Sequence, residues 1–324
     1  MIRSWVTAVC AATMLSACTA SVEVTSPEAP TTATESIPTT RAVDPARVTA
    51  EAAFGDLVAV DLCEFLKPED LREFGETRIG SPGGFDSCVV EVALPDNTRA
   101  RVYAGSFFDV LDEPSRAPSR TLAGGVRIYD GAGGECRTDI FFPDDVGLAV
   151  WAVMPTPPTI DLCPLVHRAV EAMGNRFPTG IVSTRNIASN SLAKVDACAA
   201  LPADLAGFDP TRESGRAKHS CGSPSGDATT PHVSLTLAAG YAPVADLRTD
   251  TATIDGRPTI IHKFPLVTNE GLKYCAASAA HIPIEINDLP GATEYAVVEV
   301  WLATDDKCAT AKAIAEQVWP KLPR

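Results

Sequence analysis

The sequence predicts an α+β protein: a tandem duplication of a small antiparallel-sheet domain with N- and C-terminal helices and two disulfides per copy. Three observations lead to this fold class. The two halves resemble each other, each half holds four cysteines, and each half alternates in hydropathy before it ends in an amphipathic segment. The chain has 324 residues, of which 45% are hydrophobic, so it can bury two cores of ordinary size.

Residues 1–17 are predicted to be a lipoprotein signal peptide. Arg3 supplies a positive charge, an apolar stretch follows over 5–14, and Leu15-Ser16-Ala17-Cys18 matches the lipobox of bacterial lipoproteins. The apolar stretch is too short to span a bilayer, which takes about 20 residues. We expect lipidation of Cys18 by palmitate-type chains, which would hold the protein on the extracytoplasmic face of the cell membrane. The alternative is an ordinary cleaved signal with a cysteine at its end by chance.

Residues 18–50 are expected to form a disordered tether between the lipid anchor and the folded part. From Thr19 to Val43 the chain is dominated by Ser, Thr and Pro and has few bulky apolar side chains. Burial in such a segment cannot offset the entropy that is lost on ordering. Its threonines could carry O-linked sugars, and a bare tether is an equal alternative.

An internal repeat is the strongest signal in the sequence. Leu57–Cys63 and Leu192–Cys198 carry Leu, Val, Asp and Cys at the same offsets. In both copies the match continues to an Asp-Leu pair and a phenylalanine, and a second cysteine and further alternating segments follow. We therefore place the first α+β repeat at 51–178 and the second at 179–324.

The cysteines beyond the anchor fall into two sets of four. Their separations are 25, 48 and 27 residues in the first copy and 23, 54 and 33 in the second. Four cysteines allow three pairings, and the similar first and third intervals favour pairing in sequence order. Metal ligation is the alternative, but the chain has no Cys-x₂-Cys pair. The expected disulfides are Cys63–Cys88, Cys136–Cys163, Cys198–Cys221 and Cys275–Cys308.

Local patterns predict a short helix early in each copy, several strands in the middle and a longer helix at the end. Pro68 and Pro202 suit the first turn of the short helices. Alternation or apolar runs predict strands at 88–94, 100–104, 146–153, 233–237 and 295–302. The C-terminal helices are expected to bury Leu162, Val166, Val170 and Met173 in one copy and Ala311, Ala315 and Val318 in the other.

The lipobox, the Thr/Pro-rich tether and the Val-Asp-x-Cys-x-x-Leu opening at Val60–Leu66 and Val195–Leu201 resemble uncharacterised lipoproteins of mycobacteria and other actinomycetes. The cysteine spacing that closes on a C-terminal helix is similar to extracytoplasmic sensor domains of actinobacterial serine/threonine kinases. The resemblance covers the chain from Leu57 onward. It implies an α+β fold outside the cytoplasmic membrane and a role in binding or sensing. The sequence shows no kinase and no transmembrane segment, so a signal would have to pass through an envelope partner.

The charge balance excludes one class of partner. The chain has 27 Lys and Arg against 41 Asp and Glu, a formal net charge of −14. Nucleic-acid binding needs a basic surface to meet the phosphates, so we expect no nucleic-acid partner. Electrostatic docking on anionic lipid is disfavoured for the same reason.

We expect no catalytic, metal or cofactor site. Ser191 and Lys194 formally match the Ser-x-x-Lys motif of penicillin-binding proteins. However, the first copy has Asp56 at the position of Ser191, and a Ser/Asp exchange is typical of a helix cap. No two histidines have the i, i+4 spacing of a helical zinc site. We therefore expect a non-enzymatic protein; a cell-envelope hydrolase or transpeptidase with no visible motif, or a structural envelope protein, is the alternative.

Two aromatic pairs in the first copy are the candidate apolar binding residues: Phe107, Phe108, Phe141 and Phe142. Successive strand residues point to opposite faces, so one ring of each pair should leave the main core. That ring either packs under a helix on the second face or lines a groove for an apolar ligand or an envelope protein. The sequence therefore favours the first copy, or the seam between the copies, as the site of a lipid-anchored extracytoplasmic binding or sensor protein.

Overall fold

The computed structural model describes residues 37–40, 43–81, 84–96, 98–110, 116–131, 136–154, 160–185, 187–205, 208, 213–223, 231–267, 273–286, 289–302 and 306–324. The predicted signal peptide, Cys18 and the tether up to residue 36 lie outside these ranges. Within them, no helix has the length and apolar character needed to cross a membrane.

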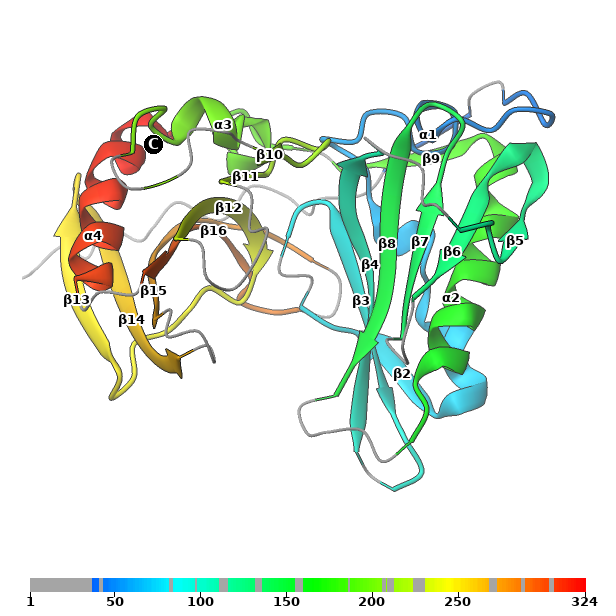
Figure 1. The fold of residues 1–324 in the computed structure, drawn as a ribbon, viewed down its shortest axis with the longest axis horizontal. Helices are drawn as coiled ribbons and strands as arrows, with labels where there is room; N and C mark the ends of the chain where they lie inside the picture. The colour runs from blue at the N-terminus through cyan, green and yellow to red at the C-terminus, as the bar shows by residue number, and fades with distance from the viewer. Residues whose placement is uncertain are drawn as a thin grey trace, which may run out of the picture. The chain divides into compact units, whose positions relative to one another are not determined.

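The first half forms a seven-stranded antiparallel sheet in the order β2-β3-β4-β8-β7-β6-β5. The long helix α2 (Cys163–Arg176) packs on one face, against β8 and β7 (Figure 1). The strands are β2 (Glu76–Ile79), β3 (Ser87–Ala93), β4 (Arg99–Asp109), β5 (Arg120–Thr121), β6 (Arg127–Asp130), β7 (Arg137–Phe141) and β8 (Val146–Val153). The short helical segments are α1 (Ala50–Phe54), η1 (Leu62–Glu64), η2 (Pro68–Phe74), η3 (Ala123–Gly125) and η4 (Phe177–Thr179).

The second half forms another seven-stranded antiparallel sheet, in the order β10-β11-β12-β16-β15-β14-β13. The strands are β10 (Glu213–Ser214), β11 (Ser220–Gly222), β12 (His232–Gly240), β13 (Thr249–Ile254), β14 (Arg257–Val267), β15 (Lys273–Pro283) and β16 (Thr293–Leu302). The helical segments are η5 (Leu192–Lys194), α3 (Ala197–Ala200), α4 (Lys307–Val318) and η6 (Trp319–Lys321). The strand order repeats that of the first sheet, with β12 in the place of β4 and β16 in the place of β8. The α+β class and the duplicated sheet are therefore confirmed. A separate two-stranded ladder pairs β1 (Ile37–Thr40) with β9 (Ile181–Thr184).

The short helices follow their caps. Pro68 begins η2, as the sequence predicts, and Gly75 ends it with a φ of 154°. By contrast, Pro202 begins no helix among the described residues. Asp196 instead accepts hydrogen bonds from the backbone nitrogens of Cys198 and Ala199 and caps α3, which precedes the proline. A residue before proline avoids the helical region, so α3 ends there.

Each half has its own apolar core between the sheet and its long helix. In the first core the ring of Phe54 is fully buried and lies 4.8 Å from Phe65, 5.2 Å from Phe107, and 5.4 Å from both Phe142 and Phe177, centroid to centroid. Edge-to-face contacts of this kind stabilise beyond the area that they bury. The predicted apolar sides of α2 and α4 all lie in their cores. Val48, which precedes the expected start of the repeat, is also buried in the first core.

The four disulfides join the expected cysteines. In each half one bond links the first cysteine to an early strand, and the other links a central strand segment to the first turn of the long helix. Each long helix is thus covalently tied to the sheet that it covers.

Candidate functional site

The two faces of the second sheet have different environments. α4 packs against β14, β15 and β16 on one face. Side chains that point toward it are buried, including Leu235, Leu237, Ala277, Val298 and Val300. Because neighbouring strand residues point to opposite faces, the residues between them point away from α4. The candidate site lies on this second face.

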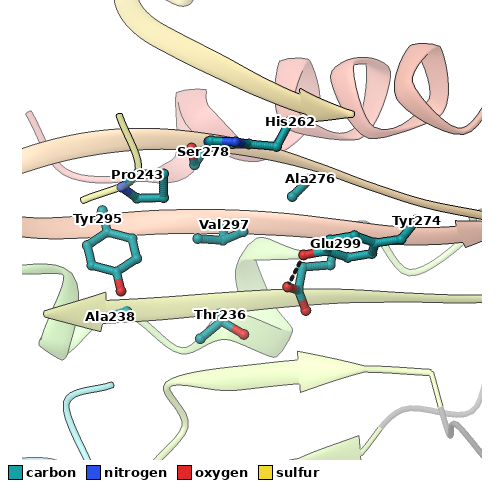
Figure 2. Close-up of a pocket in the computed structure, with 10 residues that line it drawn as sticks. All are labelled: Thr236, Ala238, Pro243, His262, Tyr274, Ala276, Ser278, Tyr295, Val297 and Glu299. Carbon is teal, nitrogen blue, oxygen red and sulfur yellow. Dashed lines mark hydrogen bonds between the residues drawn. The ribbon is translucent and has the colours of Figure 1, made fainter. Parts of the chain in front are cut away.

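A cavity of about 280 Å³ lies there, formed by β12, β14, β15, β16 and the loop after β12. Its lining combines small apolar groups, aromatic rings, hydroxyls and a carboxylate: Thr236, Ala238, Pro243, His262, Tyr274, Ala276, Ser278, Tyr295, Val297 and Glu299. Figure 2 shows Tyr295 toward one end and the Tyr274–Glu299 pair toward the other, with Val297 between them. This volume lies just below the usual range of small-molecule sites, which is about 300–1,000 Å³.

The strand register explains why these side chains converge. Glu299 on β16 lies opposite Ser234 on β12 and Ala276 on β15, and Ala276 lies opposite His262 on β14. These residues form one row across the sheet. Adjacent strands are about 4.8 Å apart, so the backbones of Glu299 and His262 are separated by roughly 10 Å. An alanine between them leaves room for a ligand.

Neutral hydroxyl groups hold the carboxylate of Glu299. It accepts a hydrogen bond from the Tyr274 hydroxyl and another, at 3.2 Å, from the Ser234 hydroxyl. Burial, followed by the neighbouring Glu299 charge, raises the pKa of Tyr274, so its phenol stays protonated and keeps donating. In the described part of the chain, no Lys, Arg or His forms an ion pair with Glu299.

Trp301 fixes Tyr274 in place. The two ring centroids are 4.6 Å apart, and His232 stacks on Trp301 at 5.5 Å. Tyr274 is only 8% exposed. Packing and the bond to Glu299 together therefore orient its ring beside the cavity.

The other two titratable groups of the cavity are uncharged near neutral pH. Burial raises the pKa of Tyr295, and its hydroxyl bonds to no described residue. Burial lowers the pKa of His262, which nearby Asp246 opposes. The cavity therefore offers aromatic and apolar surface, neutral polar groups and one negative charge, which suits binding of a small ligand.

The first sheet has different chemistry at the corresponding place. In each copy, the residue after the cysteine that is bonded to the long helix is a common reference point: Arg137 in the first and Ala276 in the second. Arg137 lies opposite Trp151, and Ala276 lies opposite Glu299. Trp151 therefore corresponds to Glu299, while Trp301 lies two residues further along its strand.

The face around Trp151 is aromatic and basic. Its ring stacks on Tyr103 with centroids 5.0 Å apart and planes within 5°. Beside this pair, Glu91 accepts from Arg78 at 2.6 Å and from Arg101 at 3.1 Å. Burial alone would raise the pKa of Glu91, but the hydrogen bonds and charges of these arginines outweigh it and lower the pKa.

The aromatic pairs of the first copy are divided between the two faces. Phe107 and Phe142 lie in the main core. Phe108 and Phe141 point to the opposite face, where their centroids are 5.8 Å apart, and Phe141 also contacts Tyr129 at 4.7 Å. One ring of each pair thus leaves the main core, as strand alternation predicts. Their role in ligand binding remains a prediction.

Ser191 is a helix cap. Its Oγ accepts from the backbone nitrogen of Ala193 at 3.0 Å and donates to Glu294 at 2.5 Å. Asp56 in the first copy likewise accepts from the backbone nitrogen of Val58 at 3.0 Å. These contacts match the cap interpretation of the Ser/Asp exchange.

Within the described residues, one group of three potential metal ligands is found: Cys136, Asp161 and Cys163. The two sulfurs are bonded to each other, so neither is a thiolate in this state. The nearby imidazole of His167 does not belong to this group, because its Nε2 lies 3.5 Å from the carboxylate of Asp130.

The sequence patterns do not predict the cavity of the second copy. The sequence predicts a buried strand at 295–302, and the alternate residues of this strand are Tyr295, Val297, Glu299 and Trp301. Aromatic and acidic side chains at every second position indicate that the second face of this strand is accessible to a ligand. Comparisons of the chain with protein-family models, curated proteins and solved structures found no match.

Proposed function

We propose that this protein is a lipid-anchored, extracytoplasmic binding or sensor protein of the bacterial cell envelope, and that its second copy binds a small molecule. The observation that carries the binding proposal is the cavity beside Glu299. It places a carboxylate, held by a phenol and a hydroxyl, among apolar and aromatic groups. A few fixed polar groups in a mainly apolar cavity are typical of ligand sites.

The proposed location, on the extracytoplasmic face of the membrane, is supported by the lipobox and by the disulfides. The lipobox at Leu15–Cys18 supports acylation of Cys18. The disulfides support an oxidising compartment, because the cytosol keeps most thiols reduced.

A non-enzymatic role is the simplest proposal for this cavity. Ser191, the residue of the one catalytic-type motif, is engaged as a cap, and the motif's Lys194 is not among its hydrogen-bond partners. Glu299 is engaged by hydroxyls that fix its position. A carboxylate fixed in this way can select a ligand by the polar group that the ligand presents to it. If the protein is a sensor, the ligand-bound state would be recognised by an envelope partner.

Native mass spectrometry tests the binding proposal. The full chain, exported to an oxidising compartment and purified in mild detergent, should carry a reproducible additional mass that denaturation releases. A bare acylated chain with four disulfides would contradict small-molecule binding and favour a structural role or a protein partner.

The anchor has its own test. Mass spectrometry of the N-terminal peptide of the membrane-extracted protein should show a chain that begins at Cys18 and carries acyl groups on this residue. An unmodified Cys18, or a mature chain that begins at another residue, would contradict acyl anchoring.

A further inference from the structure

The geometry points to a small organic cation as the ligand of the second copy: an aromatic or aliphatic body that carries a protonated amine. This inference rests on the proposed function, since it names the ligand class of the same cavity. It depends on the charge of Glu299, on the rings around it and on the contrast with the first copy.

The carboxylate of Glu299 has no cationic partner among the described residues. Both of its hydrogen-bond donors, Tyr274 and Ser234, are neutral hydroxyls. A partly buried carboxylate without a counter-ion is less favourable than one paired with a cation, because burial removes part of its hydration. A ligand ammonium group would supply the missing positive charge.

The groups around this charge suit the body of such a ligand. Tyr274 and Tyr295 present aromatic rings, and Val297 gives an apolar surface between them (Figure 2). Aromatic faces attract cations, and the attraction grows when water is excluded. An anionic ligand of the same shape would meet the Glu299 charge and be rejected.

The first copy has the same fold but different residues at the positions that would give the preference for a cation. Trp151 stands at the position of Glu299, and Arg137 stands at the position of Ala276. Arg137 is already paired with Asp139 at 2.9 Å, so the place offers a tryptophan and an internal ion pair rather than a carboxylate held only by hydroxyls. The preference for a cation should therefore belong to the second copy alone.

Isothermal titration of the full chain with three matched probes tests the inference. Benzylammonium, benzyl alcohol and benzoate share one ring and differ in charge. We expect benzylammonium to bind roughly tenfold or more tightly than benzyl alcohol, the scale of a cation near aromatic rings and a carboxylate. Benzoate should bind more weakly than either.

Glu299→Gln should abolish this preference, so that benzylammonium and benzyl alcohol bind this variant with similar affinity. Glu285→Gln, which removes an exposed charge from the same half, should retain the preference. In case Glu299→Gln disturbs the sheet, Thr236→Lys provides a second variant, because it places a competing cation in the cavity. It should remove benzylammonium binding.

Equal binding of benzylammonium and benzyl alcohol, or an unchanged preference in Glu299→Gln, would overturn the inference. If the native spectrum shows a bound molecule and benzylammonium fails to bind, the cation class is wrong and the binding function stands. If the native spectrum shows only the bare chain, the binding function itself fails.

Discussion

Phe107 and Phe108 are neighbours in the chain and lie on opposite faces of the first sheet. Ser106 adopts a positive φ of 58° at a β-bulge, where one extra residue enters β4. Phe107 then pairs with Leu148 and points into the core, while Phe108 pairs with Gly147 and points away. A bulge of this kind re-aims the side chains that follow it.

The two rings should therefore differ in what they contribute to stability. Phe107→Ala removes a ring that is 1% exposed and packed on Phe54, and should cost about 3–5 kcal/mol of unfolding free energy. Phe108→Ala, its matched control, should cost clearly less because this ring is only partly buried. Urea unfolding of both variants measures the difference. Equal losses would contradict the assignment of faces.

Gly147 and Phe108 should be energetically coupled. A Cβ on Gly147 would lie 2.2 Å from the Phe108 ring, so Gly147→Ala must displace that ring. We expect a loss of about 1–3 kcal/mol, as for other overpacked sites. In a Phe108→Ala background most of this loss should disappear, and a double-mutant cycle measures it. Additive effects would show that the ring does not cover Gly147.

Each disulfide should join two cysteines of the same copy. Non-reducing peptide mapping should give four linked peptides and none that joins the two copies. Removing Cys63–Cys88 by a double Ala substitution should cost about 3–4 kcal/mol, because a 25-residue loop is no longer closed in the unfolded chain. A disulfide between the two copies would contradict a structure in which each sheet has its own two disulfides.

Glu294 should make the protein less stable as the pH rises. Burial raises its pKa, and hydrogen bonds from Ser191 and Leu192 oppose the shift only in part. The folded state thus holds this proton more tightly than the unfolded chain, whose Glu pKa is about 4.3. The stabilisation is complete below that pH and is lost as the pH rises through the raised pKa. Relative to Glu294→Gln, the wild type should therefore lose unfolding free energy from about pH 4 upward, in urea titrations at several pH values.

Glu91 should show the opposite dependence. Its lowered pKa means that the arginine contacts stabilise the fold above the ordinary Glu pKa and are lost as the pH falls through the lowered value. Because Arg78 and Arg101 are half exposed, we expect the effect to be about 1 kcal/mol. Glu91→Gln should remove this acid-side loss. A Glu91→Gln profile that is parallel to the wild type would contradict the role of these contacts.

The sequence predicts the fold further than it predicts the site. The repeat at Leu57 and Leu192 predicts the duplicated sheets. The similar first and third cysteine intervals of the two copies predict all four disulfides, because these patterns are local in sequence. The helix expected at Pro202 does not form in the described residues, because the cap at Asp196 starts a helical turn earlier.

The cavity could not be derived in the same way. It depends on the register of four strands, which sets Glu299, Ala276 and His262 in one row although they are far apart in sequence. The correspondence of Trp151 with Glu299 also depends on register, and the presence of a tryptophan in both strands suggests a different alignment. Side-chain types alone therefore favour the first copy as the place of the binding site.

The most direct test of the account compares native mass spectra of two tryptophan variants. Val297→Trp fills the cavity, and Thr253→Trp places the same side chain at an exposed position of the same sheet. We predict that the additional mass on the wild-type protein is lost from Val297→Trp and retained by Thr253→Trp. If Val297→Trp keeps the bound mass and Phe108→Ser loses it, the ligand binds in the first copy and the central claim is wrong.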